Sequence, residues 1–154
     1  DAQESRGLGD VYKRQMLHRL VEVLGTNIGR MFEEADGEEG IVYRAGARPL
    51  IALDPLRQGR GIALERIIPY APGHLLQCNI HHLAPFGESA GPISHSGEEV
   101  GYVITGEVEL MVDDLAFRLA AGDSFSFQSE RPHHYRNLGA EPAAIFWVNT
   151  PPTF

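Results

Sequence analysis

The sequence predicts a mainly β protein, an antiparallel sandwich or barrel preceded by a short pair of helices. From residue 41 onward, apolar residues alternate with polar ones, which is the period of a β-strand. Turn residues interrupt these runs about every 8 to 12 positions, as they do in antiparallel all-β folds. The chain has 154 residues, 43% of them apolar, which is enough for one domain with its own core.

The first fifteen residues do not resemble the rest of the chain. They show no helical or strand period, and they contain the only lysine, Lys13. Residues 10–15, DVYKRQ, resemble the translation of an adapter used in DNA library preparation. We therefore expect residues 1–15 to be a non-native or disordered tail and leave them out of the fold.

Two short helices are expected within residues 16–33. Apolar residues recur at helical spacing from Leu17 to Leu24, and Gly25 follows at a position suited to a C-cap. Thr26 or Asn27 can cap a second helix. This pair is the only helical pattern that precedes the strands.

The strand-rich part follows an acidic, glycine-broken stretch at 34–40, which we expect to be a linker. The expected strands lie within residues 41–45, 49–54, 61–68, 74–83, 98–114, 115–127 and 143–150. Turns are expected at the pairs Gly106 with Glu107, Asp113 with Asp114, and Gly122 with Asp123.

Charge and composition exclude several functional classes. Thirteen basic and twenty-one acidic residues give a net charge of -8, so a broad basic footprint on nucleic acid or anionic lipid is not expected. The single cysteine, Cys78, cannot form an internal disulfide, which fits a reducing compartment. The sequence has neither a signal peptide nor an apolar run long enough for a membrane helix. We expect a cytoplasmic protein without a membrane partner.

Two histidines and a glutamate in the strand-rich part form a candidate metal site. His95 and Glu99 flank a Ser-Gly turn, and His133 follows 34 positions after Glu99. If their strands are neighbours in one barrel, the three side chains converge in a 2-His-1-carboxylate arrangement, which holds Fe(II) or similar metals and leaves coordination positions open. The alternative is a metal-free pocket in which these side chains bind a small molecule or one another.

Two segments resemble the motifs of the cupin family. GPISHSGEEVGYVITG, residues 91–106, is similar to the first motif and places His95, Glu99 and Gly106 at the family's spacing. GDSFSFQSERPHHYRN, residues 122–137, is similar to the second motif through Gly122, His133 and Asn137. The sequence departs from the motifs at Ile93, where the family has its first histidine, and at Gln128 and Glu130, which replace proline and glycine. The resemblance implies a cupin jelly-roll barrel, a double-stranded β-helix, over residues 41–154.

The cupin resemblance also implies site residues. His95, Glu99 and His133 are the expected ligands of a divalent metal, Zn, Fe, Mn or Ni, because three protein ligands plus water suffice for many such sites. The candidates for contact with a bound small molecule are His82, Tyr102, Phe127, Asn137 and Trp147. Other roles remain open: a surface position for His82, core packing for Phe127, and closure of a barrel end for Trp147.

The wider pattern resembles bacterial XRE-type helix-turn-helix regulators with a C-terminal cupin sensor. The resemblance rests on the helical pair, the acidic linker, HSGEE and the terminal WVNTPPTF. It implies that residues 16–33 are a remnant of the helix-turn-helix domain, that the recognition helix is missing upstream of Met16, and that DNA is contacted only through that missing domain. It further implies a homodimer and a small-molecule effector such as an amine, an amino acid or an organic acid.

Two other functions remain open from the sequence. A stand-alone cupin metalloenzyme, of dioxygenase or isomerase type, would use the same three ligands with its substrate in the open positions. The absence of a histidine at position 93 and the regulator-like helices argue against an enzyme. A structural or dimerisation module would bind neither metal nor ligand. Of these functions, we expect that of a small-molecule sensor in a transcriptional regulator.

Overall fold

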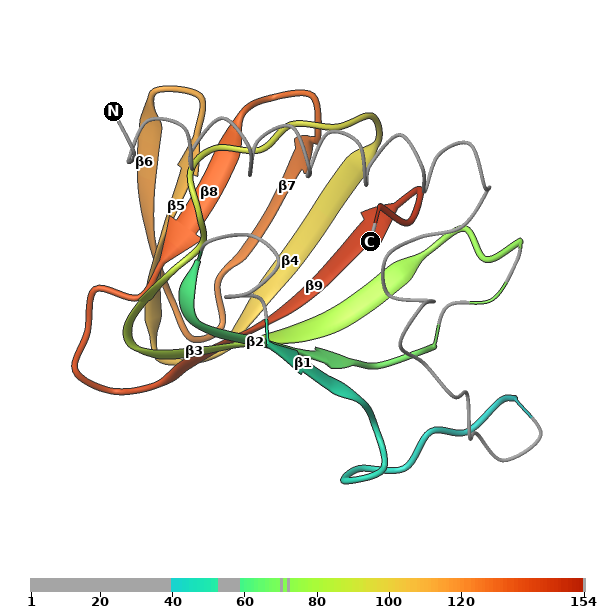
Figure 1. The fold of residues 1–154 in the computed structure, drawn as a ribbon. Helices are drawn as coiled ribbons and strands as arrows, with labels where there is room; N and C mark the ends of the chain where they lie inside the picture. The colour runs from blue at the N-terminus through green and yellow to red at the C-terminus, as the bar shows by residue number, and fades with distance from the viewer. Residues whose placement is uncertain (1–39, 53–58, 70, 72, 154) are drawn as a thin grey trace, which may run out of the picture. The chain divides into compact units, whose positions relative to one another are not determined.

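The computed structural model describes residues 40–52, 59–69, 71 and 73–153. These ranges contain nine strands and no helix (Figure 1). The strands are β1 (Leu50–Ala52), β2 (Arg60–Arg66), β3 (Gln77–Glu88), β4 (Glu98–Thr105), β5 (Glu107–Val112), β6 (Leu115–Ala120), β7 (Ser124–Gln128), β8 (His133–Arg136) and β9 (Ala143–Thr150). The tail expected at 1–15, the helices expected within 16–33 and all of the 34–40 linker except Gly40 lie outside the described residues.

All strand pairs are antiparallel, and the strands follow the order β6-β5-β8-β3-β9-β4-β7, with β2 beside β3 and β1 beside β2. The long strand β3 joins the two halves of this sheet. Its first part pairs with β2 and β9, whereas Glu88 near its end pairs with Arg136 of β8. The sheet curves from β6 at one edge to β7 at the other, which gives a nearly closed barrel (Figure 1).

Alternating burial defines the inner face of the barrel. Every second residue of β9 is buried, and β2 and β4 follow the same period. The inner face holds the apolar core, which includes Ile62, Leu64, Leu83, Val103, Val108, Leu110, Val112 and Ile145. Burial of each such side chain contributes about 1.5–3 kcal/mol, so the period-two pattern of the sequence is sufficient to specify these strands.

The mainly β prediction is confirmed, and so are the expected turns. Gly106, Asp113 and Gly122 have positive φ angles between successive strands. In the part of the chain that the structure describes, no helix is long and apolar enough to cross a membrane.

Three details differ from the sequence prediction. Residues 41–45 contain a turn and one bridge residue instead of a strand. Strand β8 was not among the expected runs. Its residues His133 and Tyr135 alternate inward, but the sequence HHYR is polar and lacks the apolar alternation on which the prediction depended. Strand β6 was expected to be half-buried, but Leu115 and Phe117 are 54% and 44% exposed, because β6 lies at a sheet edge and pairs only with β5.

Candidate metal centre

The three candidate ligands come from two strands and one loop. Glu99 is the second residue of β4, His133 is the first residue of β8, and His95 lies in the loop before β4. Backbone hydrogen bonds hold this loop in place, because the N–H of His95 donates to the carbonyl of Ser129 and Ile93 exchanges two bonds with His133. The fold therefore brings residues 95, 99 and 133 together.

Their donor atoms converge on one point. Nε2 of His95 lies 2.7 Å from Oε1 of Glu99, and Nε2 of His133 lies 3.3 Å from the same oxygen. The ligand atoms of all three residues lie within 4.8 Å of one another. Glu99 and His133 are buried, and His95 is partly exposed. This is the only group of three or more histidine, cysteine or carboxylate side chains with such spacing among the described residues.

Backbone carbonyls orient both imidazoles. Nδ1 of His133 donates to the carbonyl of Arg131 at 2.9 Å, and Nδ1 of His95 donates to the carbonyl of Ser96 at 3.2 Å. A carbonyl oxygen can only accept, so the proton of each Nδ1 is fixed and Nε2 is turned toward Glu99. Histidine ligands of metals are commonly fixed in this way.

The environment of Glu99 favours its charged form. Burial by itself raises the pKa of this carboxyl, but the hydrogen bonds from His133 and His95 outweigh burial and hold the pKa well below its ordinary value. The side chain is therefore a carboxylate at physiological pH, which is the form that binds a metal.

Trp147 contacts the other carboxylate oxygen. Its Nε1–H donates to Oε2 of Glu99 at 2.5 Å, and its ring stacks on His81 with 4.9 Å between ring centroids. Nδ1 of His81 lies 2.7 Å from the hydroxyl of Tyr135, so a buried polar and aromatic chain extends from the triad into the barrel. Of the two adjacent histidines that could project inward, the sequence prediction chose His82, although the two-residue spacing of His81 from the core residue Leu83 is a signal for an inward position of His81.

Phe127 and Trp147 lie beside the triad, and their contact with a ligand stays a prediction. Both are buried, and the ring of Phe127 lies 4.9 Å from that of His133. Asn137 is also buried, but its amide donates to the carbonyls of Ala84 and Glu141. These hydrogen bonds hold the loop between β8 and β9 in place against β3. The position of Asn137 favours a structural role.

His82 and Tyr102 do not line the barrel interior. His82 is exposed, and its Nε2 lies 2.8 Å from Oε2 of Glu65 on the outer face. Tyr102 is 48% exposed and alternates with the buried residues Gly101 and Val103 of β4. His82 thus takes the surface position that the sequence left open, and Tyr102 lies on the outer face instead of lining the cavity, because consecutive strand residues point to opposite faces and the inner face carries His81 and Glu99.

Ile93 stands at the position where the cupin motif has its first histidine. It lies directly opposite His133 in an isolated antiparallel bridge, so the two side chains share a face. Its apolar side chain offers no donor atom. The triad therefore supplies two imidazole nitrogens and one carboxylate oxygen, a set that fits Zn, Fe, Mn or Ni with open positions left.

A family model described as "Cupin domain" matches residues 79–149. The HTH-type transcriptional regulator PuuR of Escherichia coli (strain K12) is 25% identical over 138 residues, which is 90% of this chain and 72% of that protein. This relative supports a link to DNA-binding regulators. The family match includes all three candidate metal ligands and Trp147.

Solved structures support the same fold. The Cupin_2 domain of an XRE family transcriptional regulator from Enterobacter cloacae has a TM-score of 0.54 and 23% identity, over 60% of this chain and 99% of that one. A predicted oxalate decarboxylase from Thermotoga maritima has a TM-score of 0.63 and 21% identity, over 71% of this chain and 98% of that one. Likeness at this level of identity concerns the fold alone. Together with the barrel and the family match over residues 79–149, these findings show a cupin fold, in a chain that is similar in sequence to an HTH-type transcriptional regulator.

Proposed function

We propose that this chain is the effector-sensing part of a bacterial helix-turn-helix transcriptional regulator that acts in the cytoplasm. The similarity to PuuR over 138 residues supports a regulator. In this proposal residues 41–154 bind a small molecule, residues 16–33 belong to the DNA-binding half, and residues 34–40 link the two. DNA is contacted only through that half, since the chain carries a net charge of -8.

The observation that carries the proposal is the triad, in which Glu99 and His133 are buried and no fourth donor of this kind lies nearby among the described residues. His95, Glu99 and His133 would hold Zn, Fe, Mn or Ni through the two Nε2 atoms and Oε1. The bound metal would supply a Lewis-acid anchor for a carboxylate, hydroxyl or amine of the effector. Phe127 and Trp147 provide an apolar wall beside this anchor.

Binding would bias the placement of the DNA-binding half, since an effector shifts an equilibrium toward the state that it binds better. We propose a homodimer in which effector binding changes the spacing of two DNA-reading heads. An apolar stripe on the outer face of β4 supports the dimer. It consists of Val100, Tyr102 and Ile104, which are 48%, 48% and 40% exposed.

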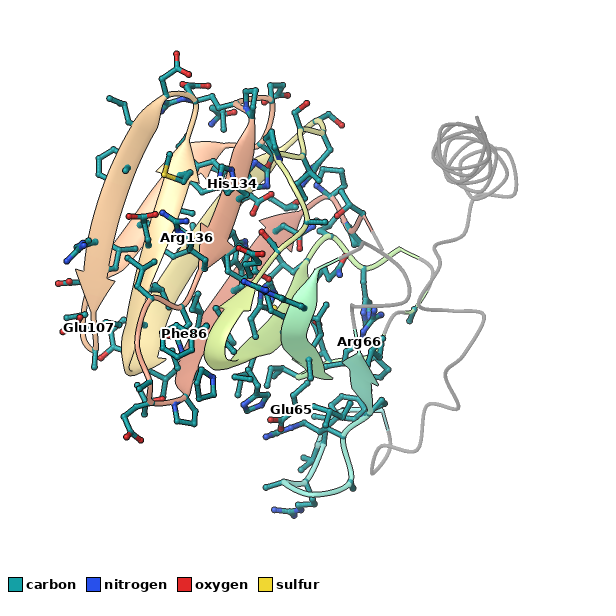
Figure 2. All side chains as sticks on the ribbon, turned by 60° about the vertical axis from the view of Figure 1, so that its left-hand side comes forward. Glu65, Arg66, Phe86, Glu107, His134 and Arg136 are labelled. Atoms are coloured by element: carbon teal, nitrogen blue, oxygen red, sulfur yellow. The ribbon has the colours of Figure 1, made fainter. Side chains whose placement is uncertain are left out.

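A metalloenzyme is the second candidate, because the same open positions would accept a substrate. A general acid or base must lie within reach of the reacting group. Both oxygens of Glu99 are engaged, and Glu109, the other carboxylate buried among the described residues, pairs with Arg136, which Figure 2 shows on the outer face. The lack of a second interior carboxylate in this part of the chain favours the sensor. Consumption of a bound compound by the metal-loaded protein would favour the enzyme.

The sensor is tested by thermal unfolding of the Zn(II)-loaded chain against a panel of amines, amino acids and organic acids. A ligand at about 100 times its Kd stabilises the native state by about 2.7 kcal/mol, which raises Tm by several degrees. The shift should vanish in His133→Ala and persist in His134→Ala. His134 is the matched control, since it is the next residue of β8 and points to the opposite face (Figure 2). A panel without any stabilising compound would contradict the proposal.

A further inference from the structure

The two oxygens of Glu99 face different groups. Oε1 faces both imidazoles, at 2.7 Å from His95 and 3.3 Å from His133. Oε2 accepts the indole hydrogen bond of Trp147. A carboxylate can bind a metal through one oxygen or through both, so the partner of Oε2 decides which mode is available.

The packing around Trp147 locks its ring in place. Trp147 is 4% exposed and lies in register with Gly101 of β4, two residues from Glu99 on the inner face. Its ring is stacked on His81 at an interplanar angle of 9° and meets the ring of Phe125 edge-on at 4.8 Å. Phe125 can approach so closely because a Cβ at Gly101 would overlap its ring. A ring fixed on several sides cannot follow a carboxylate that turns away.

The hydrogen bond between Trp147 and Glu99 is costly to break. The indole N–H can only donate, and both partners are buried. If Glu99 turned Oε2 toward the metal, the indole would be left as a buried donor without a partner, and such groups are strongly disfavoured. The hydrogen bond therefore keeps Oε2 directed at the indole, and only Oε1 is available to bind a metal.

We propose that Trp147 is a positioning residue of the metal centre, which restricts Glu99 to coordination through one oxygen. The metal then has three protein donors, and the remaining positions stay open for the effector. The inference rests on the proposed metal site and adds a residue that does not itself touch the metal.

The test compares metal binding by the wild-type chain and Trp147→Phe, with Zn(II) and Co(II) as probes. Phenylalanine keeps an aromatic ring beside His81 but has no N–H. We expect Trp147→Phe to bind both ions about 10- to 100-fold more weakly, as is typical when a partner of a metal ligand is lost. The visible spectrum of bound Co(II) should also change, because Glu99 is then free to bind through both oxygens. A purely structural role would leave this spectrum unchanged.

Phe146→Leu is the matched control, because Phe146 precedes Trp147 in β9 and points to the opposite face of the strand. Its metal affinity should equal that of the wild-type chain. If Trp147→Phe had wild-type affinity and an unchanged Co(II) spectrum, the positioning role of Trp147 would be overturned, but the metal centre would not. Absence of metal binding by the wild-type chain would overturn the metal centre as well.

A second measurement does not depend on the folding of a Trp147 variant. Trp147 is the only tryptophan of the chain, so ¹⁵N-labelled protein gives a single indole signal. We expect its Nε1–H proton to be shifted downfield and protected from exchange with water, both without and with Zn(II). Rapid exchange of this proton in the Zn(II)-bound chain would show that the indole has left Glu99 and would overturn the inference.

Discussion

Residue 93 lies across from one of the candidate metal ligands. Ile93 is opposite His133 and shares its face, so we expect a donor placed there to point toward the triad. The open coordination that the sensor requires thus depends on one apolar side chain. Trp147 contacts the triad at Glu99, and Phe127 contacts it at His133.

Replacing Ile93→His should therefore add a fourth ligand. We expect Zn(II) to bind at least about tenfold more tightly, which corresponds to about 1.4 kcal/mol, and effector binding to weaken because one open position is lost. Isothermal titration with Zn(II) and with the best compound of the panel measures both effects. Equal Zn(II) affinity in the variant and in the wild-type chain would show that residue 93 does not face the centre.

The convergence of the three candidate ligands was predictable from the sequence, whereas the contacts around them were less so. His95, Glu99 and His133 stand at motif spacing, and that spacing required no knowledge of strand pairing. The contact between Trp147 and Glu99 depends on the register of β9 against β4, which the sequence does not specify. Tyr102 was expected to line the cavity, but residues 99 and 102 are an odd number of positions apart in β4 and therefore point to opposite faces.

At the scale of the strands, a charged cluster on the outer face joins β2 and β3 to the segment before β1. Glu65 of β2 accepts a hydrogen bond from Nε of Arg48 at 2.6 Å and contacts His82 of β3 (Figure 2). The hydrogen bond with His82 lowers the pKa of Glu65, burial opposes it, and Arg48 adds to the lowering. The net pKa lies below its ordinary value, so the folded state favours the carboxylate.

This shift predicts how stability depends on pH. A carboxyl whose folded pKa is lowered stabilises the native state above its unfolded pKa of about 4.3, and the contribution is lost as the pH falls through the folded pKa. Glu65→Gln should therefore lower the free energy of unfolding by about 1–2 kcal/mol at pH 7 and by progressively less below about pH 4. Urea titrations at several pH values test this. The exposed Glu107→Gln is the control, and a Glu65→Gln difference that grows on acidification would contradict the assignment.

The packing of β4 against β7 and β9 depends on the absence of a side chain at position 101. The ring of Phe125 occupies the space of a Cβ at Gly101. Gly101→Ala should push this ring off Trp147 and cost about 1–3 kcal/mol of stability, which is typical of overpacking. Gly91→Ala serves as the control, because nothing lies within 4 Å of its added Cβ. Equal urea midpoints for Gly101→Ala and the wild-type chain would contradict this view of the packing.

At the scale of the whole molecule, hydrophobic alternation was sufficient to predict an antiparallel β sandwich or barrel, and the resemblance to the cupin motifs selected the barrel. It failed where the strand is short and polar, as in β8, and where it lies at an edge, as in β6. In both cases burial depends on which strands become neighbours, and period-two patterning does not encode that. The structure also reassigns Tyr102 from the proposed ligand pocket to the exposed stripe on β4.

The proposed dimer leads to a prediction about that stripe. If a second copy covers the outer face of β4, Tyr102→Glu places a charge in an apolar contact and should convert dimers to monomers. Sedimentation velocity measures the change in mass, and metal content should stay the same, since Tyr102 points away from the triad. A variant that sediments as the wild-type chain does would show that this face is not the interface.

The central claim is that His95, Glu99 and His133 form a metal centre, and elemental analysis tests it most directly. The chain would be purified without chelator or metal-affinity steps from medium that contains Zn, Fe, Mn and Ni. We predict about one of these ions per chain in the wild type and in His134→Ala, and almost none in His133→Ala. A metal-free wild-type chain, or an ion that remains in His133→Ala, would contradict the claim.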